Sequence, residues 1–187
     1  MAKGESPAGG SPSPLERVHL KLVETEEERA LLDRFVRQHH SYARSYRSAG
    51  EGIDWLAMLD GEVVAVVGIG DPIHPAPQGL LEHLGISKAQ YGQNLMHFAY
   101  HWRFCVARRI PNLGSRVLRL MREAAPGEWR RKYGKELKVL MTLVLAPKGG
   151  EVYRADNWEE VRRPGAKKLL FVYVLDRAWL SSLAKMK

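Results

Sequence analysis

The sequence contains one cysteine, no long apolar run, and few asparagine, glutamine and threonine residues. Because Cys105 is alone, an internal disulfide and a multi-cysteine metal site are excluded, and a reducing, cytoplasmic compartment is expected. No apolar stretch approaches the roughly 20 residues of a membrane-spanning helix, and the first residues lack a signal-peptide pattern. The patterns His-Glu-x-x-His and Gly-x-Ser-x-Gly are also absent. Neither a zinc protease nor a nucleophile-elbow hydrolase is therefore indicated, and we expect a soluble protein of another class.

The charge that is present is strongly basic, with a net charge of +8 and a pI of about 9.7. The window from Arg103 to Lys138 holds eleven Lys and Arg against three acids, so it carries the whole excess. Such clustering is typical of a protein that binds a polyanion: nucleic acid, an anionic membrane or a phosphorylated cofactor. The alternative is a generally soluble surface with thermophile-style use of arginine. The predicted nucleic-acid-binding residues are Arg119, Arg122, Arg130, Arg131 and Lys132.

The first third of the chain predicts a tail followed by a globular domain. Residues 1–14 are mostly Gly, Ser, Pro and Ala, which cannot bury enough surface to order, so we expect a disordered tail and one domain over 15–187. Alternating apolar residues from Val18 predict a first strand, and Thr25 with Glu28 forms a capping box that opens a helix. The expected buried face of that helix contains Leu32, Phe35, Val36 and His39.

The rest of the chain alternates strand and helix patterns. Two apolar runs, 53–59 and 62–69, flank Asp60-Gly61 and predict a hairpin. A helix follows Gly114, ends at Pro126 and buries one stripe, while Arg116 and the other arginines lie opposite. That stripe contains Val117, Leu120, Met121 and Ala124. The remaining expected elements are a short helix over 79–85, strands over 101–110, 137–145 and 169–175, a short basic helix over 127–133, and a final helix capped by Asp176. This order predicts an α/β fold, an α+β sandwich.

The segment 108–116 joins a predicted strand to a predicted helix and is a candidate anion site. A glycine-containing loop at a helix start presents unpaired backbone N–H groups at the positive end of the helix dipole, and the arginines add charge around it. A pyrophosphate or a nucleic-acid phosphate would fit, whereas the alternative is an ordinary connection with solvated arginines. The candidate cofactor-binding residues are Arg108, Arg109, Asn112, Leu113, Gly114, Ser115 and Arg116.

A second candidate site is the segment 150–158, which follows a buried strand where α/β proteins place ligands. It brings together the phenol of Tyr153 and the amide of Asn157, which could move a proton and orient a carbonyl. The alternative is a loop anchored to the core by its aromatic side chains. His97 and His101 lie four residues apart on one predicted strand face, where structural roles are favoured over a metal site.

Several of these motifs, in one order, resemble a known family. They are Ile110-Pro111-Asn112-Leu113-Gly114-Ser115, the segment Gly-x-x-Tyr-x-Ala-x-Asn-Trp over 150–158, and Val-Tyr-x-Leu-Asp-x-x-Trp over 172–179. Over residues 16–180 the chain resembles a domain of unknown function found in Druantia-type anti-phage proteins. Its Tyr-x-Ala-x-Asn-Trp element is similar to that of the phage Mom DNA-modification proteins, which belong to the GNAT-like acetyltransferase superfamily.

The resemblance implies a single GNAT-like domain with a mixed, mostly antiparallel central sheet flanked by helices. It also implies acetyl-CoA or a related acyl-CoA at the cradle over 112–116, and catalysis near Tyr153, Asp156 and Asn157. The implied function is a transferase that modifies an exocyclic amino group of a DNA base, with DNA favoured over RNA and no membrane partner. The relatives carry an acid where this chain has Leu145-Ala146-Pro147, a departure that favours the alternative, a non-catalytic nucleic-acid-binding module. A subunit of a nucleoprotein assembly, as a homo-oligomer or in a larger complex, is the third possibility.

Overall fold

A seven-stranded sheet organises the fold, which the computed structural model describes over residues 13–40, 50–162 and 165–186. Most of the predicted tail lies outside these residues. The strand order is β1-β2-β3-β4-β5-β7-β6. The strands are β1 His19–Leu22, β2 Gly52–Leu59, β3 Glu62–Gly70, β4 Phe98–Val106, β5 Val139–Leu145, β6 Glu159–Val161 and β7 Lys168–Val174. All neighbouring pairs are antiparallel except β4 and β5, so the predicted mixed, mostly antiparallel sheet is confirmed.

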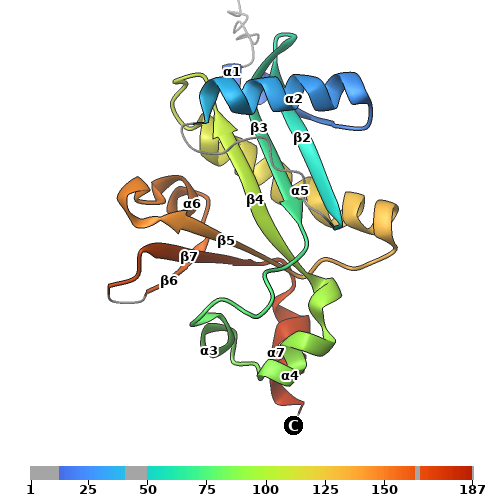
Figure 1. Ribbon diagram of the computed structural model, residues 1–187, viewed down its shortest axis with the longest axis vertical. Coiled ribbons are helices and arrows are strands. Elements are labelled where there is room, and N and C mark those ends of the chain that lie inside the picture. Colours follow the sequence, from blue (N-terminus) through green and yellow to red (C-terminus); the bar gives the residue numbers. More distant parts are fainter. Residues whose placement is uncertain (1–12, 41–49, 163–164, 187) are drawn as a thin grey trace, which may run out of the picture.

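Helices cover both faces of this sheet and one end of it (Figure 1). They are α1 Pro14–Arg17, α2 Glu26–His39, α3 Leu80–Leu84, α4 Lys88–Gln93, α5 Leu113–Tyr133, α6 Glu151–Ala155 and α7 Arg177–Lys185, with 3-10 turns η1 Leu95–His97 and η2 Ala146–Lys148. α2 packs on Leu56 of β2, whereas α5 packs in the cluster that contains the neighbouring Trp55. Because successive residues of a strand face opposite sides, α2 and α5 lie on opposite faces.

The local signals at element ends are confirmed. Thr25 and Glu28 form both hydrogen bonds of a capping box at the start of α2, and Asp176 caps α7 by accepting from the Trp179 N–H. Asp60 and Gly61, both at positive φ, turn β2 into β3. His39, which the pattern places on the buried face of α2, is instead exposed where that helix ends.

Pro126 does not end the helix that contains it, so the prediction of two helices is wrong. α5 runs unbroken through Pro126 to Tyr133. A proline inside a helix costs about 3 kcal/mol, because it removes a hydrogen bond and crowds the preceding turn. The continued helix buries Trp129, however, and burying roughly 200 Å² of an aromatic side chain contributes about 5 kcal/mol. The buried stripe contains Leu113, Val117, Leu118, Met121, Ala125 and Trp129, with Leu120 and Ala124 only partly covered.

The single parallel pair, β4 with β5, is short and opens into a wedge. Residues 98–100 pair with residues 139–141, and beyond this point β4 continues along β3 while β5 continues along β7. The register of β3 against β4 shifts between Gly68 and Ile69, which leaves Trp102 as an extra residue. A bulge of this kind bends a strand. β4 also begins three residues before the predicted 101 and ends four before 110. Figure 1 shows β5, β6 and β7 turning away from β2, β3 and β4.

Candidate functional site

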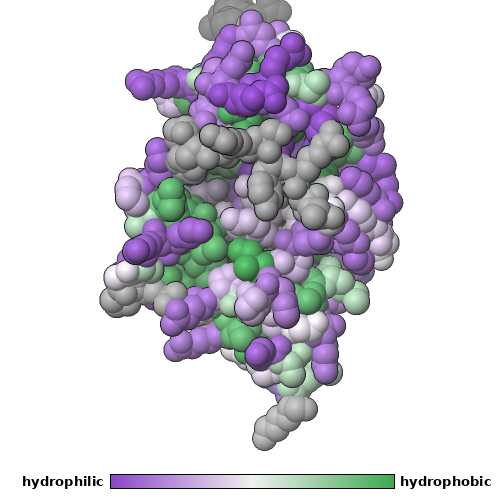
Figure 2. Space-filling model, in the orientation of Figure 1, coloured by the Kyte–Doolittle hydropathy of each residue, from purple (hydrophilic) through white to green (hydrophobic). Residues whose placement is uncertain are grey.

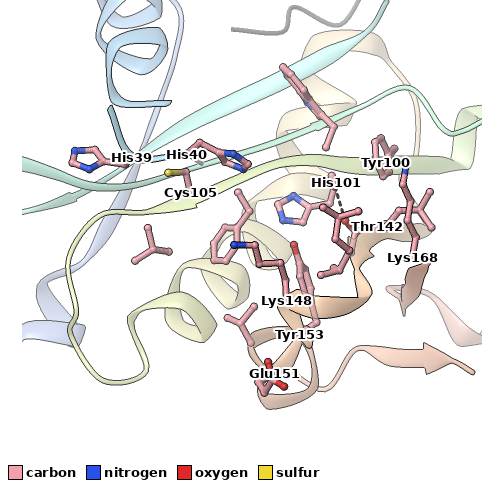
Figure 3. Close-up of a pocket in the computed structure, with 18 residues that line it drawn as sticks. His39, His40, Tyr100, His101, Cys105, Thr142, Lys148, Glu151, Tyr153 and Lys168 are labelled. Carbon is pink, nitrogen blue, oxygen red and sulfur yellow. Dashed lines mark hydrogen bonds between the residues drawn. The ribbon is translucent and has the colours of Figure 1, made fainter. Parts of the chain in front are cut away.

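A cavity of about 650 Å³ occupies the wedge between β4 and β5. β4 lines it between Tyr100 and Val106, β5 lines it between Thr142 and Leu145, and the first residues of α6 close one side (Figure 3). At the apex of the wedge the Thr142 hydroxyl donates a hydrogen bond of 2.8 Å to the backbone carbonyl of His101. This side-chain hydrogen bond lies directly after the last backbone pair of β4 and β5. The cavity begins where the two strands separate.

His101 lies at the deep end of this cavity and is 2% exposed. Its Nδ1 is 2.9 Å from the Gly68 carbonyl oxygen. Burial lowers the pKa of His101 to about 4, although the hydrogen bond to Gly68 acts in the opposite direction. The imidazole is therefore neutral at physiological pH. From the sequence a structural role was favoured for His101, and a histidine within an apolar strand was the one signal for a role in a site.

Tyr153 faces His101 across the cavity from α6. The two ring centroids are 5.8 Å apart, and in Figure 3 the Tyr153 hydroxyl points toward the imidazole. Gly150 begins α6 at a φ of 72°, and a Cβ there would lie 2.5 Å from the ring of Phe171. That ring stacks on Tyr153 with centroids 5.3 Å apart, so Gly150 allows the close packing that holds the phenol in place.

Tyr153 and Asn157 lie in different local structures, because residues 151–155 form α6 and Asn157 follows it. α6 buries Tyr153, whereas Asn157 follows the helix at a φ of 61° and is exposed. The Trp158 N–H donates to the Tyr153 carbonyl at 2.9 Å, which closes the turn. Among the described residues that line the cavity, Tyr153 is the one predicted catalytic residue.

Asp156, also predicted to be catalytic, holds α6 against α5. Its carboxylate accepts two hydrogen bonds of 2.7 Å from Arg122 and one of 3.0 Å from the Trp158 indole. The carboxylate is 4% exposed, and Asp156 raises the pKa of Arg122 by hydrogen bonding to its guanidinium. The Arg122 guanidinium also lies 4.0 Å from the centre of the Tyr173 ring. Arg122, predicted to bind nucleic acid, is therefore occupied by an internal contact.

The predicted cofactor cradle lies at the start of α5, where Gly114 is close to Val152 and Phe104 of the cavity lining. Asn112 precedes the helix at a φ of 62°, and the Ser115 hydroxyl donates to its carbonyl at 3.1 Å. Arg108 pairs with Glu62, and the Arg116 Nε donates to the Leu15 carbonyl at 3.1 Å, while Arg109 is exposed. The cradle residues are thus brought together at one helix end.

Gly114 has a packing role in this cradle. A Cβ at Gly114 would lie 2.7 Å from Cγ2 of Val152 on α6. A glycine here therefore lets α5 and α6 approach each other. A substitution at Gly114 would therefore report on helix packing before it reported on a ligand.

The other predicted nucleic-acid-binding residues lie on the surface of α5, beside acidic or carbonyl partners. Arg119, Arg130 and Arg131 remain more than half exposed. The ion pairs are Arg119 with Glu123, Arg130 with Glu136, and Arg131 with Glu24 and Glu128. The Lys132 amino group donates a hydrogen bond to the Gly52 carbonyl. Much of the basic window is thereby neutralised locally, because each of these acids lies beside its arginine.

The two histidines that the sequence placed on one strand face do not share a site. His97 lies in η1, where its Nδ1 is 2.7 Å from the Glu136 carbonyl oxygen, while His101 contacts Gly68. Within residues 13–40, 50–162 and 165–186, no cluster of three or more His, Cys, Asp or Glu side chains could hold a metal ion. The helices described there include none of the length and apolarity needed to cross a membrane.

The charges around the cavity also went unpredicted. Lys148 and Lys168 lie at its rim with His39 and His40. The single carboxylate among the described lining residues is Glu151, which lies 3.6 Å from the Arg154 guanidinium and is largely exposed. Burial, followed by the positive charges of Lys148 and Arg103, lowers the pKa of His40. The rim is therefore cationic, and the walls beside it are apolar, as Figure 2 shows over the β5 region.

Comparison with known proteins identifies the fold. No protein-family model and no curated protein matches the sequence. Among solved structures, the GNAT domain of S. lividans PAT is similar with a TM-score of 0.51 at 14% identity, over 83% of this chain and 89% of that chain. Arabidopsis thaliana NAA60 in complex with acetyl-CoA gives 0.55 at 15% identity, over 84% and 98%. The aminoglycoside acetyltransferase AAC(6′)-Ib in complex with coenzyme A gives 0.54 at 15% identity, over 84% and 94%. The chain therefore has the GNAT fold, a single α/β domain built on a seven-stranded mixed sheet.

Proposed function

We propose that the protein is an acyl-CoA-dependent acyltransferase that works in the wedge between β4 and β5. The observation that carries this proposal is the cavity itself, which places the Tyr153 hydroxyl opposite the buried imidazole of His101. Two of the similar solved structures were determined with acetyl-CoA or coenzyme A bound, which supports the choice of cofactor. A buried phenol and a buried imidazole that face one space can serve as the general acid and the general base of acyl transfer.

The residues present fit an acyl-CoA. The 21-residue helix α5 begins close to Val152 and Phe104 of the cavity lining, so its first N–H groups and Arg109 would hold the pyrophosphate. A cavity of about 650 Å³ accommodates an extended arm and an acyl group. When bound, the cofactor supplies the acyl group as a thioester. Arg116 stabilises the same region by tying α5 to the Leu15 carbonyl.

Within this proposal, Tyr153 donates its hydroxyl proton to the leaving sulfur. Its ring is 6% exposed and is fixed by Phe171 on one side and Trp158 on another, so the hydroxyl is oriented before any ligand arrives. Asp156 is a positioning residue, because its ion pair with Arg122 holds α6, and with it Tyr153, in place. Asn157 lies outside the cavity lining and receives no role in the reaction.

Acetyl-CoA should raise the melting temperature of the protein. A ligand at 100 times its Kd stabilises the folded state by about 2.7 kcal/mol, which corresponds to roughly 5–10 °C for a chain of this size. Arg109→Glu should reduce the shift by repelling the pyrophosphate, and Arg119→Glu, further along α5, serves as the matched control. Differential scanning fluorimetry checks both. An unchanged melting temperature at millimolar acetyl-CoA would contradict the proposal.

A second candidate is that the acceptor, or a non-catalytic binding partner, is nucleic acid. The net charge of +8 and the exposed arginines of α5 favour it, and so does the resemblance to Mom and Druantia-type proteins. In this case affinity for duplex DNA should fall with salt at a log–log slope of about −0.9 per phosphate contact.

The contacts in the structure decide which arginines should be replaced by glutamate in the DNA-binding test. Replacing Arg119, Arg130 and Arg131 by Glu should weaken DNA binding and flatten the salt slope, while Arg122 is left intact because it supports α6. Fluorescence anisotropy over a salt series measures both quantities. Binding that is insensitive to salt and to these changes would remove α5 as a DNA-binding surface.

A further inference from the structure

His101 has a buried nitrogen that forms no hydrogen bond with any residue that the structure describes. A carbonyl oxygen only accepts hydrogen bonds, so the contact with Gly68 at 2.9 Å places the hydrogen on Nδ1 and leaves a lone pair on Nε2. Nε2 is buried and has no hydrogen-bond partner among the described residues. A buried acceptor left in this state destabilises the protein, and native structures reserve such atoms for ligands, ordered water or function.

His101 lines the cavity, and aromatic side chains hold its ring in place. The ring of His101 is surrounded by aromatic rings, with centroid distances of 5.7 Å to Phe104, 5.8 Å to Tyr153 and 6.0 Å to Trp158. These ring contacts fix the plane of the imidazole. Because His101 lines the cavity, a donor bound there can reach Nε2.

The charges that face His101 select against a cationic ligand. η2 contributes Lys148, the end of α2 contributes His39 and the following His40, and β7 contributes Lys168. β5 contributes the uncharged hydroxyl of Thr142, already bonded to the His101 carbonyl, and α6 contributes Glu151. In Figure 3 Glu151 lies at the far side of the cavity from His101, and its carboxylate lies near Arg154. An ammonium group would therefore find positive charges at the rim and no facing carboxylate among the described residues.

We propose that His101 is a catalytic residue whose Nε2 takes the proton of an uncharged N–H or O–H nucleophile, carried by a molecule whose anionic group binds at the cationic rim of the cavity. This inference rests on the proposed acyltransferase function and names the acceptor class for it. Burial lowers the pKa of His101 to about 4, so the group is a weak base that cannot strip a proton from an alkylammonium ion. It can take the proton of a weakly basic amine or a hydroxyl, because that proton becomes strongly acidic as the bond to the acyl carbon forms.

His101 and Tyr153 together account for both proton transfers of the acyl-transfer step. The nucleophile forms a bond to the acyl carbon, and the carbon–sulfur bond breaks with its electron pair moving to sulfur. His101 Nε2 takes the proton of the nucleophile while the Tyr153 hydroxyl protonates the sulfur. The proton on Nε2 then returns to the Tyr153 oxygen, toward which the imidazole already faces, so both side chains regain their starting states.

Four related amines test the proposed class of acyl acceptor. The probes are 4-aminobenzoate and 4-aminophenyl phosphate, each an anion with an uncharged amine, 4-(aminomethyl)benzoate, an anion with an ammonium group, and 4-aminobenzamide, without the anion. Acetyl transfer from acetyl-CoA is followed by thiol release and mass spectrometry. We expect transfer to the two anionic arylamines, with their ratio distinguishing carboxylate from phosphate, and at least about tenfold less to the other two, as for a lost hydrogen-bonded charge contact. Preference for the ammonium probe would overturn the proposal.

Variants of His101 separate proton transfer from positioning. His101→Asn keeps a donor for the Gly68 carbonyl and lacks Nε2, so kcat should fall by about 10²–10⁴-fold. His101→Gln places an oxygen near the Nε2 position, so it should restore the KM for the probe without restoring kcat. His97→Asn, in η1 and outside the cavity lining, is the matched control and should retain activity. Full activity in His101→Asn would overturn the proposal.

A measurement on the unaltered protein guards against variants that fail to fold. Nitrogen-15 NMR of the histidine side chains should show Nδ1 protonated and Nε2 unprotonated at pH 7, with Nε2 shifting when 4-aminobenzoate and coenzyme A are added together. The activity profile should be flat from neutral pH downward until it falls toward pH 4. If acetyl-CoA fails to bind, the proposed function fails. If it binds but no probe shifts Nε2, the function stands and the inference about His101 is wrong.

Discussion

Tyr153→Phe should lower acyl transfer by about 10²–10⁴-fold while leaving the fold and acetyl-CoA binding in place. The change removes one oxygen from a ring held by Phe171 and Trp158, and neither ring contact uses that oxygen. Without the hydroxyl the leaving sulfur departs unprotonated, and the proton taken by His101 has no return path. Single-turnover transfer with saturating acetyl-CoA measures the loss directly, because it separates chemistry from product release.

Tyr173→Phe is the matched control for this prediction. Tyr173 lies on β7 outside the cavity lining, and its ring contacts the Arg122 guanidinium. If the Tyr153 hydroxyl only ties down the loop, its loss would cost about 1 kcal/mol of stability and leave transfer unchanged. A Tyr153→Phe protein that melts lower yet still transfers acyl groups at the original rate would end the catalytic assignment.

Arg122→Met should destabilise the protein by about 3–5 kcal/mol, the penalty for leaving one charge of a buried pair unpaired. The Arg122 and Asp156 side chains are 13% and 4% exposed, and their two hydrogen bonds of 2.7 Å join α5 to the end of α6. For this chain length the loss corresponds to roughly 6–20 °C in melting temperature. Since α6 carries Tyr153, acyl transfer should fall as well, and thermal unfolding with an activity assay measures both effects.

Two further variants isolate the buried pair. Arg119→Met removes an exposed arginine of the same helix that pairs with Glu123, and it should change stability by no more than about 0.5 kcal/mol. The double variant Arg122→Met with Asp156→Leu removes both charges and should recover much of the loss. A mild effect of Arg122→Met alone, equal to that of Arg119→Met, would mean that the pair does not hold α6.

Local signals made much of the fold predictable. The capping box at Thr25, the turn at Asp60-Gly61 and the cap at Asp176 are each set by neighbouring residues, and all three are confirmed. The β2–β3 pair and the buried strand β5 follow from apolar runs for the same reason. Tyr153 was identified by its place after a buried strand, and the structure does place it on the cavity wall.

What escaped prediction depends on long-range packing. α5 continues through Pro126 because Trp129 is buried beyond it, a contact that no local rule contains. The wedge opens because a bulge at Trp102 separates β4 from β5, and the register of β3 decides where that bulge falls. The ion pair of Asp156 with Arg122 joins residues 34 positions apart in the sequence, so no local pattern predicts it.

Amide hydrogen exchange with and without acetyl-CoA tests the central claim most directly, because it shows where the cofactor binds. We predict slower exchange along β4 from Tyr100 to Val106, along β5 from Thr142 to Leu145, and in the first turn of α5 after Asn112. α4 and α7, at the other end of the sheet, should be unchanged. Acetyl-CoA that leaves β4 and β5 unprotected, or that protects α4 and α7 instead, would contradict the assignment of the wedge as the acyl-transfer site.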